Sequence, residues 1–193
     1  MKKLDQNVNY IVSGLERSGT SMMMQILHAA GIPIASDNSR PPDEHNPKGY
    51  HELEGGKIIN RLMDGKFPLD NFKGSFIKIT AYGLQFLPTG NYKIIYMERN
   101  LEEILDSMEK MAGIEDKERD KTRGSFHRLN EMIKKHITTR KDIKVLFSNY
   151  NDILSNPKNN MEKICDFLGL PGLDVHEMIT VVDKRLYRQR RQQ

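Results

Sequence analysis

Short apolar segments, separated by polar and glycine-containing stretches, predict a series of strands along the chain. The first segment, VNYIVSG, is a brief apolar run that ends in glycine, which is typical of a buried strand. The same pattern predicts strands at residues 8–14, 75–80, 92–98 and 143–148.

Amphipathic segments lie between these strands and predict helices. The clearest apolar stripe consists of Phe126, Leu129, Ile133 and Ile137. Asn100, with Glu103 three positions later, forms a helix start signal. Helices are expected at residues 20–31, 51–65, 100–111, 116–140, 157–170 and from Val175 onward. This alternation predicts an α/β fold, a three-layer sandwich with a central, mainly parallel sheet.

Length and composition narrow the class of protein. The 193 residues are enough for a single domain spanning 1–193, and no apolar run approaches the roughly 20 residues of a membrane helix. The lone Cys165 excludes an internal disulfide and predicts a reducing, cytoplasmic setting. The net charge of +4 is concentrated partly in a basic C-terminal end, 184–193. Aromatic residues do not interleave with the basic ones, so nucleic acid is not an expected partner.

The loop after the first strand carries the strongest chemical signal. Its sequence, SGLERSGTS, has Gly14 and Gly19 at the spacing of a nucleotide-binding phosphate loop, but Thr20 stands in the lysine position. Gly19 allows close approach of the backbone to an anion, and the following helix offers unpaired N–H groups. Hydroxyl groups and positive charge are supplied by Ser18, Thr20, Ser21 and Arg17. The loop therefore predicts an anion site.

Two kinds of anion fit such a loop. A P-loop kinase or NTPase binding ATP with Mg²⁺ needs the lysine and a carboxylate at another strand end, for which Glu98 is the candidate. The stretch RSGTS instead resembles the 5′-phosphosulfate loop of the sulfotransferase family. That resemblance implies a fold like that of the P-loop NTPases, with 3′-phosphoadenosine 5′-phosphosulfate (PAPS) as the donor, adenosine 3′,5′-bisphosphate (PAP) as the product, and no metal.

Further segments share this resemblance. Sulfotransferases hold the 3′-phosphate with an arginine at a strand end and a serine eight residues later, a spacing that Arg99 and Ser107 reproduce. The segment 147–171 also resembles the family, and it places Tyr150 where family members contact the nucleoside. In the basic end, Lys184, Arg185 or Arg188 is expected near the cofactor.

The general base is the least determined part of the predicted site. Some family members use a histidine two residues after a lysine, but here Lys78 is followed by Thr80 at that position. Others use a glutamate, and NPKGYHE at the end of the long loop 35–50 resembles bacterial sulfotransferases. We expect Glu52 to be the base, with Glu44 and His45 as alternatives. Lys78 is expected to stabilise the charge that builds on the leaving group.

The sequence thus predicts a PAPS-dependent sulfotransferase that acts on a hydroxyl or amine of a small-molecule, glycan or lipid acceptor. A kinase or NTPase, and a non-catalytic nucleotide-binding protein that has lost its base, are the alternatives.

Overall fold

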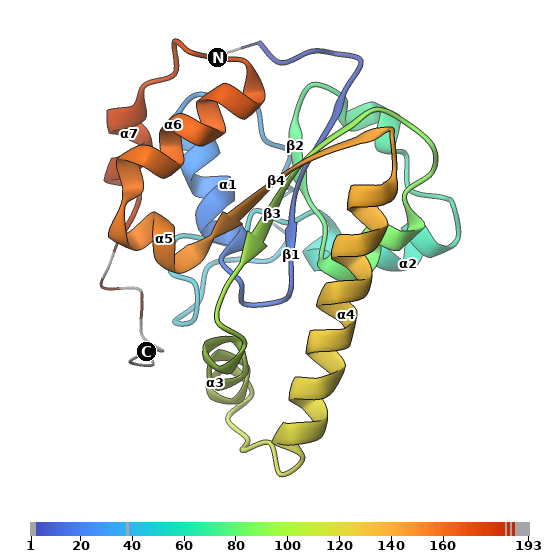
Figure 1. Ribbon diagram of the computed structural model, residues 1–193, viewed down its shortest axis with the longest axis vertical. Coiled ribbons are helices and arrows are strands. Elements are labelled where there is room, and N and C mark those ends of the chain that lie inside the picture. Colours follow the sequence, from blue (N-terminus) through green and yellow to red (C-terminus); the bar gives the residue numbers. More distant parts are fainter. Residues whose placement is uncertain (1–2, 38, 184, 186, 188–193) are drawn as a thin grey trace.

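The computed structural model describes residues 3–37, 39–183, 185 and 187. Its centre is a sheet of four parallel strands, β1 (Asn9–Gly14), β2 (Phe76–Lys78), β3 (Tyr92–Glu98) and β4 (Ile143–Asn149), in the order β2-β1-β3-β4 (Figure 1). After β1 the chain forms β2 on one side of β1, and it then crosses to form β3 on the other side of β1. The carboxyl ends of β1 and β3 therefore form a topological switch point, where open α/β sheets bind ligands.

Alternate residues of the strands face two separate hydrophobic clusters. Tyr10 and Val12 belong to one cluster, whereas Ile11 between them belongs to the other. The first cluster packs α1 (Thr20–Ala29), α5 (Tyr150–Ser155), α6 (Pro157–Leu168) and α7 (Val175–Thr180) on one face of the sheet. The second packs α2 (Ile58–Met63), α4 (Arg119–Thr139) and a 3₁₀ helix (Ala81–Phe86) on the other. This confirms the predicted α/β fold with helices on both faces of a parallel sheet.

The helix α3 (Leu101–Ala112) follows β3 and lies beyond the carboxyl edge of the sheet (Figure 1). The predicted start signal is confirmed, because the side chain of Asn100 accepts hydrogen bonds from the backbone N–H groups of Glu102 and Glu103. The carboxylate of Glu103 turns toward Arg99 at the end of β3. The cap therefore places the first turn of α3 directly beside the predicted phosphate site.

The prediction of one continuous helix over 51–65 is wrong. A short 3₁₀ turn (Glu54–Gly56) precedes α2, and Gly55 and Gly56 have φ angles of +62° and +83°. His51 also has a positive φ, of +51°. These left-handed residues interrupt the helical hydrogen-bond pattern, so Glu52 lies on irregular backbone rather than in a first helical turn.

Other differences concern short elements. The strand predicted over 75–80 is limited to β2, and the short helix α5 and the 3₁₀ helices Leu69–Phe72 and Ala81–Phe86 were not predicted. Their few turns carry too little periodicity to stand out in the sequence. Cys165 is buried in α6 with a free thiol. In the part of the chain that the structure describes, no helix has the length and apolar character required to cross a membrane.

Candidate active site

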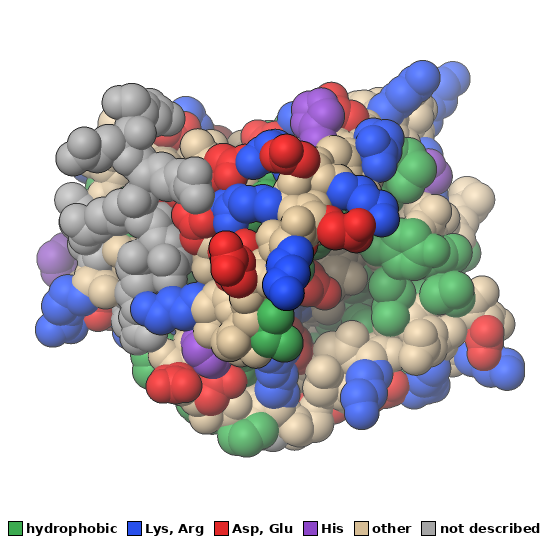
Figure 2. All heavy atoms as spheres, turned by 90° about the horizontal axis from the view of Figure 1, so that it is seen from below, with side chains coloured by type: hydrophobic (Ala, Val, Ile, Leu, Met, Phe, Trp, Pro, Cys, Tyr) green, Lys and Arg blue, Asp and Glu red, His purple; other side chains and the backbone are tan. Residues whose placement is uncertain are grey.

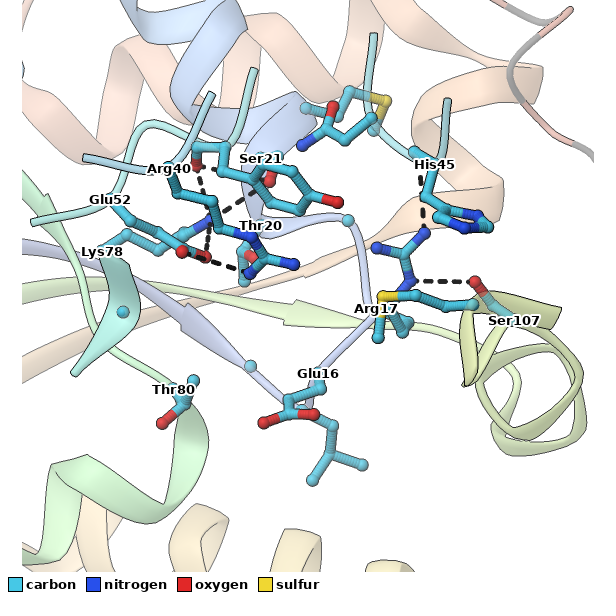
Figure 3. Close-up of a pocket in the computed structure, with 18 of the residues that line it drawn as sticks. Glu16, Arg17, Thr20, Ser21, Arg40, His45, Glu52, Lys78, Thr80 and Ser107 are labelled. Carbon is cyan, nitrogen blue, oxygen red and sulfur yellow. Dashed lines mark hydrogen bonds and ion pairs between the residues drawn. The ribbon is translucent and has the colours of Figure 1, made fainter. Parts of the chain in front are cut away.

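A cavity of about 330 Å³ opens at the carboxyl edge of the sheet, where β1, β2 and β3 end. Seen from below in Figure 2, the surface is hollowed there, with charged side chains around one side and apolar side chains beside the other. The loop after β1, the end of β2, the second half of α3 and the long loop 35–50 all contribute to its walls (Figure 3). The cavity therefore lies where the predicted site residues were expected to meet.

The loop between β1 and α1 is tightly packed. A Cβ atom on Gly14 would lie 2.5 Å from both the Met97 carbonyl oxygen and Ser18 Oγ. A Cβ on Gly19 would lie 2.5 Å from the ring of Tyr150, and Gly19 has a φ of +102°. Both positions therefore require glycine on steric grounds. The first turn of α1 contains no acidic residue, so its positive dipole end is not neutralised by its own side chains.

Arg17 joins the two predicted phosphate motifs. Its Nε donates a hydrogen bond of 2.9 Å to Ser107 Oγ on α3, although the two residues are 90 positions apart. A second guanidinium nitrogen donates to the carbonyl oxygen of His45 at 3.4 Å (Figure 3). Arg17 itself has a left-handed backbone, with φ of +66°. The loop after β1 and the helix after β3 thus present one continuous cationic and hydroxyl-bearing surface to the cavity.

Arg99 lies behind this surface and also lines the cavity. Its side chain is 8% exposed and forms a 3.0 Å ion pair with Glu103. One of its terminal nitrogens donates a 3.1 Å hydrogen bond to the backbone oxygen of Arg17. The guanidinium also lies 4.6 Å from the centroid of the Tyr150 ring, close enough for a cation–π contact. Arg99, Ser107 and Tyr150 therefore line the same cavity.

On the other side of the cavity, Glu52 lies between two cations. Its carboxylate accepts from Lys78 Nζ at 2.8 Å and from Arg40 at 3.3 Å, and its side chain is 12% exposed. Lys78 also donates to Ser21 Oγ at 3.1 Å and to the Tyr50 carbonyl oxygen. Burial lowers the pKa of Lys78 below its ordinary value, and the charge of Glu52 opposes that shift. Lys78 from β2 therefore contacts Ser21, the last residue of the loop motif in which Thr20 stands in the lysine position.

Some of the remaining predicted residues line the cavity and others do not. His45 and Thr80 line the cavity, as do Thr20 and Ser21. Glu44 has a side chain that is 86% exposed, pairs with His45, and is not among the lining residues. Ser18 is fully buried, and its hydroxyl faces Gly14 rather than the cavity. Ser18 does not line the cavity, and its backbone N–H donates to the Leu15 carbonyl oxygen at 3.2 Å, so it supports the loop rather than facing a ligand.

Several lining residues were not anticipated. Arg40 comes from the long loop and stacks on the Tyr50 ring at 3.5 Å, while Glu16 projects into the cavity from the phosphate loop (Figure 3). Loop residues such as these carry no periodic signal, and only the folded loop shows which of them point inward. Arg185 is exposed and pairs with Asp183, whereas Lys184 and Arg188 lie outside the described residues. Among the described residues, no group of three or more His, Cys, Asp and Glu side chains has a metal-binding arrangement.

Comparison with known proteins identifies a family. Residues 8–192 match the family model described as the sulfotransferase domain. No curated protein matches the sequence. The sulfotransferase domain of the Synechococcus PCC 7002 olefin synthase is 14% identical with a TM-score of 0.55, over 97% of this chain and 83% of that one.

Two other solved structures share the fold. A mouse sulfotransferase complexed with PAP is 16% identical with a TM-score of 0.58, over 97% of this chain and 69% of that one. A retinol dehydratase in complex with androsterone and PAP is 18% identical with a TM-score of 0.51, over 95% of this chain and 65% of that one. At such low identities these likenesses establish the arrangement of the sheet and helices.

Proposed function

The chain belongs to the sulfotransferase domain family, and on that basis we propose that it moves the sulfuryl group of PAPS to a hydroxyl or amine acceptor, without a metal. The observation that carries the proposal is the contact between Arg17 and Ser107. It unites the loop after β1 with the motif after β3 in one cavity, so two phosphate groups of a single nucleotide can be held side by side. A magnesium-dependent kinase or NTPase gives no reason for the eight-residue spacing of Arg99 and Ser107 along the chain.

The donor fits the residues on one side of the cavity. We assign the 5′-phosphosulfate to backbone N–H groups within residues 17–21, those of Arg17, Gly19, Thr20 and Ser21, which line the cavity, and to the Arg17 side chain. The helix dipole of α1 favours an anion at this position. We assign the 3′-phosphate to Arg99 and Ser107, and the nucleoside to Tyr150. The close packing of Gly14 and Gly19 supports the assignment, because it keeps the loop narrow and its amides near the cavity.

The chemistry is assigned to the opposite side. The acceptor oxygen forms a bond to sulfur as the bond between sulfur and the 5′-phosphate oxygen breaks, and Glu52 takes the acceptor proton. Lys78 lies 2.8 Å from Glu52 and stabilises the negative charge that develops on the departing phosphate oxygen. Lys78 bonds one oxygen of Glu52 and Arg40 bonds the other, so each oxygen retains a lone pair that can receive the proton. His45 is the alternative base within the cavity.

Nucleotide preference tests the proposal against the ATP alternative. PAP at a hundredfold excess over its Kd is expected to stabilise the protein by about 2.7 kcal/mol, which raises Tm by roughly 5–10 °C for a chain of this size. Arg99→Ala should remove most of this shift, whereas Glu98→Gln should retain it. Glu98 ends the same strand but pairs with Lys134 on α4. Stabilisation by ATP with Mg²⁺ and not by PAP, measured by differential scanning fluorimetry, would contradict the proposal.

The acceptor is inferred only as a class. The retinol dehydratases among the matched structures were solved with androsterone and with retinol, both small molecules. The apolar lining residues Ile58, Ile59 and Ile79 favour an acceptor that carries its hydroxyl on a partly apolar body. Glycans and lipid head groups are the other classes to include in an acceptor screen. A reducing, cytoplasmic compartment is our inference from the single, unpaired cysteine.

A further inference from the structure

A buried carboxylate behind the cavity has no part in the chemistry assigned above. Glu103 in α3 is 1% exposed, and its carboxylate pairs with Arg99 at 3.0 Å. The hydroxyl of Tyr187, near the C-terminal end, donates a hydrogen bond to the same carboxylate. Asn151 of α5 donates to the Tyr187 hydroxyl at 2.7 Å and to Glu103 at 3.4 Å. We call these residues, Arg99, Glu103, Asn151 and Tyr187, the Glu103 clamp.

The clamp surrounds the guanidinium of Arg99 on several sides. The rings of Tyr150 and Tyr187 meet edge to face at 5.7 Å, and Arg99 lies 4.6 and 5.6 Å from their centroids. Burial and the bond to Glu103 raise the pKa of Tyr187 to about 12, so its hydroxyl remains a donor at neutral pH. The Nε atom of Arg99 donates to Glu103, and the guanidinium lies against the rings of Tyr150 and Tyr187. These contacts together fix the orientation of the guanidinium plane.

That orientation aims Arg99 at the phosphate loop. Its terminal nitrogen donates to the carbonyl oxygen of Arg17, whose left-handed φ of +66° is unfavourable for a residue with a side chain. A hydrogen bond to this carbonyl favours the conformation in which the Arg17 side chain reaches Ser107 at 2.9 Å. A continuous chain of contacts therefore runs from Tyr187, through Glu103 and Arg99, to the residue at the centre of the nucleotide site.

We propose that Glu103 is a positioning residue that, held by Tyr187 and Asn151, orients Arg99 and through it sets the conformation of the phosphate loop. Arg99 then acts on both ends of the nucleotide, as a ligand of the 3′-phosphate and as a support of the loop that holds the 5′ end. The inference rests on the proposed function, because it concerns the same nucleotide site. It also makes the docking of Tyr187 a requirement for tight nucleotide binding.

Two ligands separate loop support from simple contact with the 3′-phosphate. PAP has that phosphate, whereas adenosine 5′-phosphosulfate lacks it. Loss of a buried hydrogen bond to a charged group is worth about a factor of ten in affinity or more. Glu103→Gln in the full chain is therefore expected to raise the Kd of both ligands by about tenfold, as measured by isothermal titration calorimetry. A role confined to the 3′-phosphate would raise the Kd of PAP alone.

A milder variant shows whether the loss of affinity arises without general unfolding of the protein. Tyr187→Phe keeps the ring beside Arg99 and removes only the hydroxyl, so we expect a rise of about threefold in both Kd values with little change in Tm. Tyr96→Phe is the matched control, because it removes a hydroxyl that bonds Asn130 at 2.8 Å in the opposite layer. Glu98→Gln is the control for Glu103→Gln. Both controls should bind PAP and adenosine 5′-phosphosulfate as the wild type does.

The possible results distinguish failure of the proposed function from failure of the positioning role of Glu103. If the wild type does not bind PAP, the proposed function fails. If the wild type binds PAP but Glu103→Gln and Tyr187→Phe bind both ligands with unchanged Kd at a temperature where circular dichroism shows them folded, the positioning role is wrong. Weakened binding of PAP with unchanged binding of adenosine 5′-phosphosulfate would also overturn it. Weakened binding of both ligands, with the controls unaffected, supports it.

Discussion

Glu52→Gln is expected to lower sulfuryl transfer by about 10²- to 10⁴-fold, the usual contribution of a general base, and to leave the Kd of PAP within about twofold. The substitution keeps the size of the side chain and one acceptor oxygen, which can replace the carboxylate oxygen that accepts from Lys78 at 2.8 Å, while the bond from Arg40 at 3.3 Å is lost. It removes the ability to take a proton. Turnover should be measured with PAPS over a panel of hydroxyl acceptors, and PAP affinity by calorimetry.

Two further variants make that result interpretable. Glu54→Gln is the matched control, because Glu54 is exposed, pairs with Arg61 and does not line the cavity. It should retain wild-type turnover. His45→Ala tests the alternative base within the cavity. Full activity in Glu52→Gln, together with a large loss in His45→Ala, would transfer the role of base from Glu52 to His45.

Gly19→Ala is expected to destabilise the protein by about 2–5 kcal/mol and to abolish detectable PAP binding. The added Cβ would lie 2.5 Å from Cδ2 of Tyr150, and the φ of +102° is unfavourable for alanine. Relief requires either a shift of Tyr150, which contacts Arg99, or a shift of the loop itself. Both movements disturb the assigned nucleotide site. Thermal unfolding and calorimetric titration with PAP measure the two effects.

Gly31→Ala is the control for Gly19→Ala, because it introduces the strain of left-handed backbone without a steric clash like that with Tyr150. Gly31 follows α1 with a φ of +73°, but a Cβ there meets no atom within 4 Å. Gly31→Ala should therefore lower the free energy of unfolding by only about 1–2 kcal/mol, the cost of alanine in left-handed backbone, and keep its affinity for PAP. Equal Tm values and equal PAP affinities for the two variants would show that the packing of Gly19 against Tyr150 is unimportant.

Much of the site could be predicted because its motifs are local. Gly14 and Gly19 in the loop, and the eight-residue interval from Arg99 to Ser107, are visible as spacings along the chain. The structure places these residues around one cavity. The general base is harder to predict, because Glu44, His45 and Glu52 stand close together in a loop without periodicity. Exposure distinguishes them, since Glu44 faces solvent while Glu52 is enclosed by Lys78 and Arg40.

Local residue patterns specify the alternation of strands and helices, the anion loop after the first strand and the spacing of Arg99 and Ser107, since these depend on neighbours within a few turns. The contact of Arg17 with Ser107, the ion pair of Glu52 with Lys78 and the bond from Tyr187 to Glu103 become visible only in the folded chain. They join residues far apart in the sequence, and no local pattern relates such residues to one another. Left-handed backbone at Arg17 and Gly55 adds turns that residue patterns do not specify.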